Sequence, residues 1–317
     1  MDPVKSNEVA YEMLPVLRVY KDGRVERYQG TEVVPSSLDP HTGVLSKDIM
    51  ITPQTNVSAR IYLPNNQSIQ KLPLIIYFHG GRFCIESAFS PTTHHYLNLL
   101  VSKSNVIAVS INYRLAPEHP LPTAYDDSWT ALQWVATHFK GEGHEVWLKE
   151  HVDFGRVFLV GDSAGANIAH NMAMRAGHEG LVDMEIYGVA LVHTYFWGEE
   201  SIGSEALNME KKANVDSAWP FVCPSSPSND DPRINPMAVG APMLSGLGCT
   251  SVLVCVAEKD VFRDRGWLYY ETLKRSGWKG IVEIVETQGE DHIFHLRNLS
   301  SEKGADLTKC LADFFNS

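Results

Sequence analysis

Short, continuous apolar runs alternate with amphipathic stretches along most of this chain, and this alternation is what most limits its fold. The runs show no polar residue at every second position, so they suit strands that are buried on both faces of a parallel sheet. They occupy residues 72–78, 106–113, 157–160, 186–192, 252–256 and 281–285. Helical periodicity occupies residues 128–139, 164–175, 263–276 and 305–315. The pattern predicts a doubly wound α/β fold with a mostly parallel sheet.

The N-terminal part follows a different pattern. Residues 19–28 alternate apolar and polar side chains around Asp22-Gly23, a dipeptide typical of tight hairpin turns. We therefore expect a hairpin that opens the sheet. Two further strands are expected at residues 47–51 and 57–63, on either side of a turn-rich segment.

A long segment from Trp197 to Asp231 interrupts the alternation and ends in a Pro-, Ser- and Asn-rich stretch. An insertion of this length in a compact sheet usually forms a lid or a binding element, although a segment without function is the alternative. We expect one domain over residues 1–317, with a helical cap formed by about 1–17 and about 197–232.

Composition narrows the classes of function. The formal net charge of −11 disfavours a nucleic-acid partner, because binding phosphates requires a basic face. No stretch approaches the roughly 20 apolar residues of a membrane span, and the first residues lack the apolar core of a signal peptide, so we expect no membrane span and a cytoplasmic location. The five cysteines lack paired spacing and indicate free thiols.

A candidate nucleophile lies in Gly161-Asp-Ser163-Ala-Gly165, between a buried run and an Ala-rich helical stretch. This is the setting of a nucleophile elbow, in which glycines keep side chains out of a tight turn and the serine projects at the carboxyl edge of the sheet. An ordinary glycine-rich turn between strand and helix is the alternative interpretation.

A second glycine motif, His79-Gly80-Gly81, ends the run at residues 72–78. The amides of Gly80 and Gly81, with the amide of Ala164 at the start of a helix, are predicted to form an oxyanion hole. His79 precedes these donors and is expected to brace the loop.

A serine nucleophile needs a base and an acid that orients the base, in the chain order Ser, Asp, His. Asp260 and His292 each follow a buried run, where a parallel sheet presents its carboxyl edge. Glu258 and Asp264 are rival acids, and His295 is a rival base; we expect Asp264 to interact with its helix dipole and His295 to be packed locally.

Other chemistries lack a motif. The sequence has no Gly-x-Gly-x-x-Gly, no Walker loop and no His-Glu-x-x-His, and His94-His95 has no third ligand at zinc-site spacing. We expect no cofactor and no metal.

Several motifs together resemble a known family, the hormone-sensitive-lipase branch of the α/β-hydrolases. That resemblance is carried by His79-Gly-Gly-Arg-Phe83, residues 112–119, residues 161–170 and Ala257-Glu-Lys-Asp260. A closer similarity to plant carboxylesterases is carried by residues 16–27, 195–198, 276–280 and 290–295. The resemblance implies an eight-stranded sheet with a helical cap, a triad of Ser163, Asp260 and His292, and a small-molecule ester as substrate.

Two positions depart from that family. Arg82 stands where Gly or Ala is common, and Thr194 replaces a proline. Arg82 either points to solvent or brings a cation near the substrate, which would favour acidic esters. Side chains predicted to bind substrate are Arg82, Phe83, Tyr195, Trp197, Trp219, Phe221 and Phe294. For each aromatic residue, core packing is the alternative; as a set they favour small or aromatic acyl groups.

The same family also contains 2-hydroxyisoflavanone dehydratases, cyclases and gibberellin receptors, so the fold cannot decide the function. The receptors lack the catalytic histidine, and His292 therefore argues against a purely binding role. A lyase or cyclase stays open, because such enzymes keep the triad geometry. We predict a serine carboxylesterase, with its physiological ester and oligomeric state undetermined.

Overall fold

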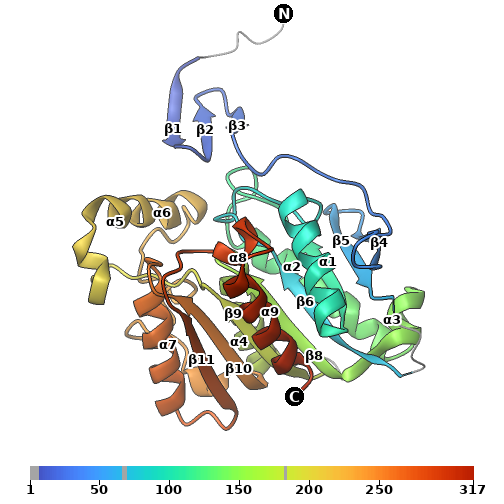
Figure 1. Ribbon diagram of the computed structural model, residues 1–317. Coiled ribbons are helices and arrows are strands. Elements are labelled where there is room, and N and C mark those ends of the chain that lie inside the picture. The colour runs from blue at the N-terminus through green and yellow to red at the C-terminus, as the bar shows by residue number, and fades with distance from the viewer. Residues whose placement is uncertain (1–6, 66–69, 182–183) are drawn as a thin grey trace, which may run out of the picture.

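The computed structural model describes residues 7–65, 70–181 and 184–317. Its centre is a sheet formed by β4 (Leu45–Thr52), β5 (Val57–Leu63), β6 (Leu72–Phe78), β7 (Ile107–Asn112), β8 (Val152–Asp162), β9 (Ile186–Val192), β10 (Cys249–Ala257) and β11 (Ile281–Thr287). The eight strands lie in the order β11-β10-β9-β8-β6-β7-β5-β4 (Figure 1). Only the β4–β5 and β5–β7 pairs are antiparallel. The predicted mostly parallel sheet is confirmed.

Helices cover both faces of this sheet, because side chains along a strand point alternately to opposite faces. Ile75 and Tyr77 belong to a core cluster with α1 (Pro91–Ser104) and α9 (Glu302–Phe315). Leu74 and Ile76 belong to a second cluster with α2 (Thr123–Phe139), α4 (Ala164–Glu179) and α7 (Arg263–Arg275). The strands between the two helical layers are therefore almost wholly apolar.

Two elements differ from the expected pattern. The edge strand β11 is not buried on both faces: exposed and half-buried residues alternate along it. Val282 and Ile284 pack against the core on one face, whereas Ile281 on the other face is exposed. Helix α1 was not predicted. Its buried side includes Thr93, His94 and Asn98, and these polar residues hide the helical periodicity.

The N-terminal hairpin does form at Asp22-Gly23, but it does not open the central sheet. β1 (Val9–Met13), β2 (Leu17–Tyr20) and β3 (Val25–Arg27) make a separate three-stranded antiparallel sheet. Met13 and Leu17 of this sheet are buried in the core, and Tyr11 stacks on Phe221 with ring centroids 4.1 Å apart. The hairpin strands thus find their apolar partners outside the central sheet.

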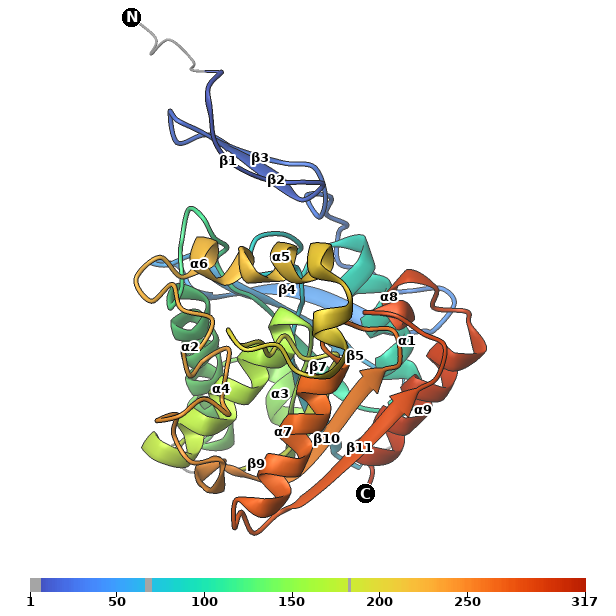
Figure 2. The same cartoon turned by 90° about the vertical axis from the view of Figure 1, so that its left-hand side faces the viewer.

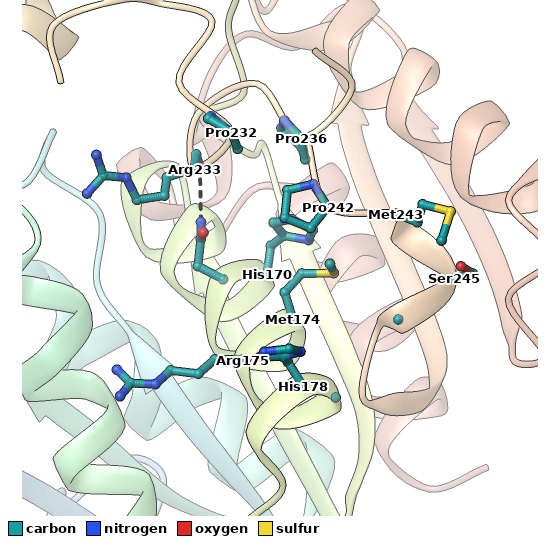
Figure 3. A pocket seen from close by; sticks show the side chains of 13 residues that line it. His170, Met174, Arg175, His178, Pro232, Arg233, Pro236, Pro242, Met243 and Ser245 are labelled. Atoms are coloured by element: carbon teal, nitrogen blue, oxygen red, sulfur yellow. Dashed lines mark hydrogen bonds between the residues drawn. The ribbon is translucent and has the colours of Figure 1, made fainter. Parts of the chain in front are cut away.

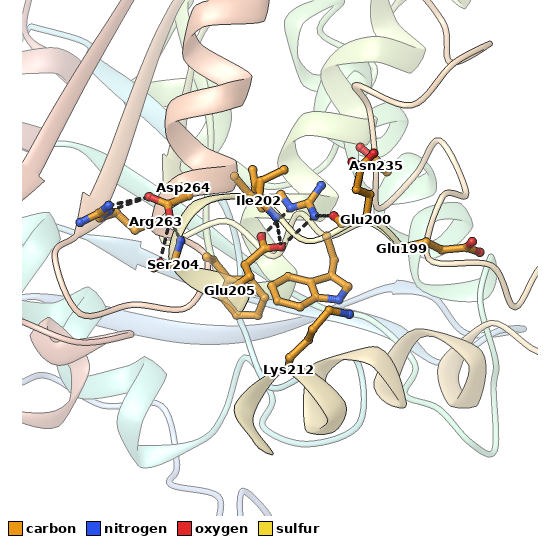
Figure 4. Close-up of polar contacts among 12 residues, drawn as sticks. Glu199, Glu200, Ile202, Ser204, Glu205, Lys212, Asn235, Arg263 and Asp264 are labelled. Carbon is orange, nitrogen blue, oxygen red and sulfur yellow. Dashed lines mark hydrogen bonds and ion pairs between the residues drawn. The ribbon is translucent and has the colours of Figure 1, made fainter. Parts of the chain in front are cut away.

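The segment after β9 contains η1 (Gly203–Leu207), α5 (Met209–Asp216) and α6 (Ala218–Val222). Helices α5 and α6 lie between the small sheet and the carboxyl edge of the central sheet (Figure 2). A buried ion pair of 2.6 Å between Arg265 of α7 and Glu205 of η1 ties the segment down, and Asp264 accepts hydrogen bonds from Ser204 beside it (Figure 4). That this layer acts as a cap stays a prediction, and residues 1–6 of the predicted cap lie outside the described residues.

Two further predictions concern the cysteines and membrane-spanning helices. All five cysteines are free thiols, as predicted. Among the described residues, no helix combines the length and apolar character that crossing a membrane requires.

Candidate active site

Ser163 lies at a sharp turn between β8 and α4. Its backbone has φ 54° and ψ −117°, a strained conformation for a residue with a side chain. The turn is possible because two glycines allow close backbone approach: a Cβ on Gly165 would collide with the carbonyl of Phe78 in β6, and one on Gly161 would collide with the Gly165 backbone. The expected elbow conformation therefore follows from local sequence.

His292 joins Ser163 to Asp260. His292 Nε2 lies 2.9 Å from Ser163 Oγ, and its Nδ1 lies 2.7 Å from Asp260 Oδ2. The other carboxylate oxygen, Asp260 Oδ1, accepts a hydrogen bond of 3.0 Å from the amide of Phe262. Burial raises the pKa of Asp260, but the charge and hydrogen bond of His292 outweigh burial and leave this pKa below its ordinary value. The three residues predicted from strand ends are thus brought into one hydrogen-bonded chain.

The rival residues are engaged elsewhere. Glu258 accepts a hydrogen bond from the Gly289 amide, and Asp264 is bonded to Ser204 and Arg263. His295 is buried, and its ring lies edge-on to Tyr96 with centroids 5.1 Å apart. None of these three is hydrogen-bonded to Ser163 or His292 within the described residues.

His193 is a residue of this site that we did not predict. It directly follows β9, and its Nδ1 accepts a hydrogen bond of 2.9 Å from the amide of Ile293. Burial lowers the pKa of His193 to about 3, so the ring is neutral and Nδ1 is free to accept. Ile293 has φ 48°, and this bond supports its strained backbone beside His292. The position after a buried strand is the signal that could have identified it.

His193, Asp260 and His292 also form the one group of three potential metal ligands in the described chain, with atoms within 4.8 Å of one another. Both ring nitrogens of His292 already contact Asp260 and Ser163, and His193 Nδ1 is occupied by the Ile293 amide. These imidazoles could therefore bind a metal ion only if one of these hydrogen bonds were broken.

The three predicted oxyanion donors have different surroundings. The Asp162 carboxylate interacts with the Gly80 backbone and also accepts a hydrogen bond from the Tyr77 hydroxyl. The role of Gly80 as an oxyanion donor stays a prediction. Gly81, with φ 101°, lines the cavity beside Ser163. Among the described residues, the amides of Gly81 and Ala164 meet no acceptor.

His79 has the bracing position that we expected. Its Nδ1 lies 2.8 Å from the carbonyl oxygen of Gly80, and its ring stacks on Tyr113 with centroids 4.2 Å apart. Burial lowers the pKa of His79 to about 4. Through these two contacts His79 braces the loop that carries Gly80 and Gly81.

A cavity of about 270 Å³ opens at Ser163. Its lining residues are Pro15, Val16, Gln29, Gly81, Arg82, Ile85, Ser163, Tyr195, Val215, Ala218, Phe262, His292, Ile293 and Arg297. They come from the small sheet and the loop after β3, the loop after β6, the turn before α4, α5, α6, the loops after β9, β10 and β11, and α8 (Phe294–Arg297). The wall is mostly apolar, with two arginines.

Of the seven residues predicted to bind substrate, Arg82 and Tyr195 line this cavity. The other five do not: Phe83, Trp197, Trp219 and Phe294 are buried in the core, and Phe221 stacks on Tyr11. Phe83 and Trp219, for example, pack edge-to-face with centroids 6.4 Å apart. For these rings core packing is the correct interpretation, because they fill space between elements and leave the cavity to smaller aliphatic side chains.

A second cavity of about 540 Å³ lies along the outer side of α4 (Figure 3). Its lining includes His170, Met174, Arg233, Pro236 and Met243. It contains none of the residues of the Ser163 site.

Comparison with known proteins gives a consistent result. A family model described as an α/β hydrolase fold matches residues 75–296. A protein of Arabidopsis thaliana named probable carboxylesterase 2 is 52% identical over 310 residues, which cover 98% of this chain and 97% of that protein. The 2-hydroxyisoflavanone dehydratase of Glycyrrhiza echinata is 49% identical, covering 98% of this chain and 97% of that protein.

Solved structures of esterases share the architecture. An esterase from Pyrobaculum calidifontis is 28% identical with a TM-score of 0.71, and the match covers 85% of this chain and 84% of that one. A thermostable carboxylesterase cloned from a metagenomic library is 26% identical with a TM-score of 0.72, and covers 89% and 90% of the two chains.

Proposed function

Because this chain belongs to the plant carboxylesterase family of the α/β-hydrolases, we propose that it is a carboxylesterase that hydrolyses small esters through an acyl-enzyme on Ser163. One observation carries the proposal: His292 lies within hydrogen-bond distance of both Ser163 and Asp260, at 2.9 and 2.7 Å. A serine hydroxyl is a weak nucleophile at neutral pH, and this contact supplies the base that it needs.

In the proposed reaction, Ser163 Oγ attacks the ester carbonyl while its proton passes to His292 Nε2. Asp260 accepts a hydrogen bond from Nδ1–H of His292, which fixes the tautomer and stabilises the imidazolium that forms. Collapse of the tetrahedral intermediate breaks the bond to the alcohol, which leaves with the proton from His292. Water then attacks the acyl-enzyme by the same steps and releases the acid.

Negative charge develops on the carbonyl oxygen during both steps. The amides of Gly81 and Ala164 are the proposed donors to this oxyanion, since each flanks Ser163 or the cavity and lacks another acceptor in the described residues. Losing one such donor typically raises the barrier by about 3 kcal/mol.

A second candidate is a lyase, because the relatives named 2-hydroxyisoflavanone dehydratase are 49% and 46% identical over almost the full chain. In an elimination, His292 would remove a proton from carbon, and no bond to Ser163 Oγ would form. The covalent state of Ser163 therefore distinguishes the two reactions.

The test is hydrolysis of p-nitrophenyl acetate, butyrate and octanoate by purified protein, with and without a serine-directed organophosphate. We expect hydrolysis that the reagent stops, with one adduct located on Ser163 by mass spectrometry. Ser163→Ala should lose all turnover above background and keep the melting temperature of the unchanged protein. Folded protein with neither hydrolysis nor adduct would exclude the esterase and favour the lyase.

A cytoplasmic location also stays a proposal. Two relatives are named for organelles, one mitochondrial and one chloroplastic. Imaging of a tagged full chain in plant cells tests the location directly.

A further inference from the structure

The arginines of this chain fall into two groups by their partners. The sequence contains thirteen arginines, and in the described residues eleven of them form an ion pair with Asp or Glu. The two that form none are Arg82 and Arg297, and both line the cavity at Ser163. Among the described residues, the arginines without a carboxylate partner thus both lie at this one cavity.

Arg82 is held in place by neutral atoms. Its Nη1 donates to Asn214 Oδ1 at 2.8 Å and lies 3.6 Å from Met13 Sδ. A guanidinium carries five N–H donors, so most of those on Arg82 stay available. Asn214 belongs to α5, and Arg82 directly follows Gly81 in the loop beside Ser163. The contact therefore orients the side chain without neutralising its charge.

A third group in the cavity also lacks a partner. Tyr195 is 3% exposed and lines the cavity, yet its hydroxyl has no hydrogen bond in the described residues. Buried hydroxyl groups in native proteins are almost always hydrogen-bonded. Burial raises the pKa of Tyr195, and the Arg82 charge opposes that rise, so the hydroxyl is protonated and within electrostatic reach of the guanidinium.

Nearby carboxylates do not compete for these cations. Asp291, beside His292, has its carboxylate 3.8 Å from Lys211 Nζ. Asp216 of α5 is paired with Lys212 at 2.7 Å. These two acids, each next in sequence to a residue that lines the cavity, are therefore paired with lysines and not with Arg82 or Arg297.

From these unpartnered groups we infer that the Ser163 cavity selects esters that carry a carboxylate, bound by Arg82 and the Tyr195 hydroxyl, with Arg297 attracting it at the mouth. The inference rests on the proposed esterase function. Arginine suits this role because its planar fork matches a carboxylate. The remaining wall is largely apolar and accommodates a short hydrocarbon between the ester and the carboxylate.

The carboxylate can lie on the acyl side or on the alcohol side of the ester. Mono-p-nitrophenyl glutarate and its neutral counterpart p-nitrophenyl valerate test the acyl side, and 4-acetoxybenzoate and phenyl acetate test the alcohol side. The measured quantity is the ratio of kcat/KM for the anionic ester to that for the neutral ester, each corrected for spontaneous hydrolysis. On at least one side we expect this ratio to exceed unity.

Variants then assign the selectivity to its residues. Arg82→Gln should lower the ratio at least about tenfold, the effect of losing one charge-assisted hydrogen bond. Tyr195→Phe and Arg297→Gln should lower it less, and the Arg297 contribution should weaken in 0.5 M NaCl because exposed charges are screened. The matched control is Arg275→Gln, which removes an exposed arginine paired with Glu271 on α7 and should leave the ratio unchanged.

A binding measurement on the unchanged protein keeps the test independent of folding defects. Glutarate should inhibit valerate hydrolysis competitively and at lower concentration than glutaramide, its neutral counterpart. Equal inhibition by both, or a ratio that is the same in Arg82→Gln, Arg297→Gln and the unchanged protein, would overturn the carboxylate site. If the unchanged protein neither hydrolysed p-nitrophenyl valerate nor formed the organophosphate adduct on Ser163, the proposed esterase function itself would be overturned.

Discussion

Two cavities border helix α4, one at its N-terminal end and one along its outer side, and they differ most in the state of their polar groups. In the larger cavity three of these groups have partners: His170 Nδ1 lies 3.1 Å from the Tyr269 hydroxyl, Arg233 is paired with Asp231, and Asn171 donates to the Arg233 carbonyl. In the smaller cavity Tyr195 has no partner and Arg82 has no counter-charge in the described residues.

The difference teaches that volume alone does not identify a site. The larger cavity has about 540 Å³ against about 270 Å³, yet His170, Asn171 and Arg233 in its wall already have partners. A buried polar group without a partner costs stability, and the Tyr195 hydroxyl is such a group in the wall of the smaller cavity. The following changes test whether the smaller cavity is the functional one and the larger is only structural.

The largest effect is expected for Asp260→Asn. An asparagine presents the wrong hydrogen-bonding group to His292 Nδ1, so the imidazole no longer holds the tautomer that accepts the serine proton. We expect kcat for p-nitrophenyl butyrate to fall about 10⁴-fold. The control is Asp264→Asn, at the rival acid, for which we expect less than about tenfold. An Asp260→Asn enzyme within tenfold of the unchanged protein would show that this carboxylate does not support catalysis.

The second test uses the buried carboxyl beside the nucleophile. Burial raises the pKa of Asp162 to about 6, against an ordinary value of about 4. The folded state therefore favours the protonated form. Its stabilising contribution is full below about pH 4 and is lost as the pH rises through about 6, a change of up to about 3 kcal/mol.

Urea unfolding from pH 4.5 to 8 measures this contribution. In Asp162→Asn the free energy of unfolding should fall less with rising pH than in the unchanged protein. The buried histidines act in the same pH range with the opposite sign, but both proteins contain them, so the difference isolates Asp162. Parallel pH profiles of the two proteins would contradict the raised pKa.

A smaller effect is expected at the positioning residue His193. His193→Phe removes the acceptor for the Ile293 amide and loosens the turn that carries His292, so kcat should fall on the order of tenfold. His193→Asn places an amide oxygen near the position of Nδ1 and should restore most of this loss. Equal kcat values for folded Phe and Asn variants would show that the hydrogen bond has no catalytic effect.

The smallest effect is expected in the larger cavity. Met174→Trp places an indole in that space, away from Ser163, and kcat/KM for p-nitrophenyl butyrate should change less than about twofold. Circular dichroism and melting temperature verify that the variant is folded. A tenfold loss of kcat/KM in folded protein would show that the larger cavity affects the reaction. The functional contrast between the two cavities would then be weaker.

The sequence alone determined the features that depend on local pattern. Buried strands and amphipathic helices show their own periodicity, and an elbow at Ser163 needs glycines at fixed neighbouring positions. Asp260 and His292 were found because the ends of parallel strands meet at one edge. Helix α1 was not predicted, because polar residues are buried on its inner side and interrupt the apolar periodicity.

Only the tertiary structure decided which side chains face the substrate cavity. Trp197 and Trp219 are as apolar as any cavity wall, but they are buried between elements, whereas Pro15, Val215 and Ile293 converge on Ser163 from distant segments. The close approach of the Asp162 side chain to Gly80 was equally hidden. Burial and exposure at a junction depend on how separate elements pack, and a local sequence pattern records only the face that a residue occupies within its own element.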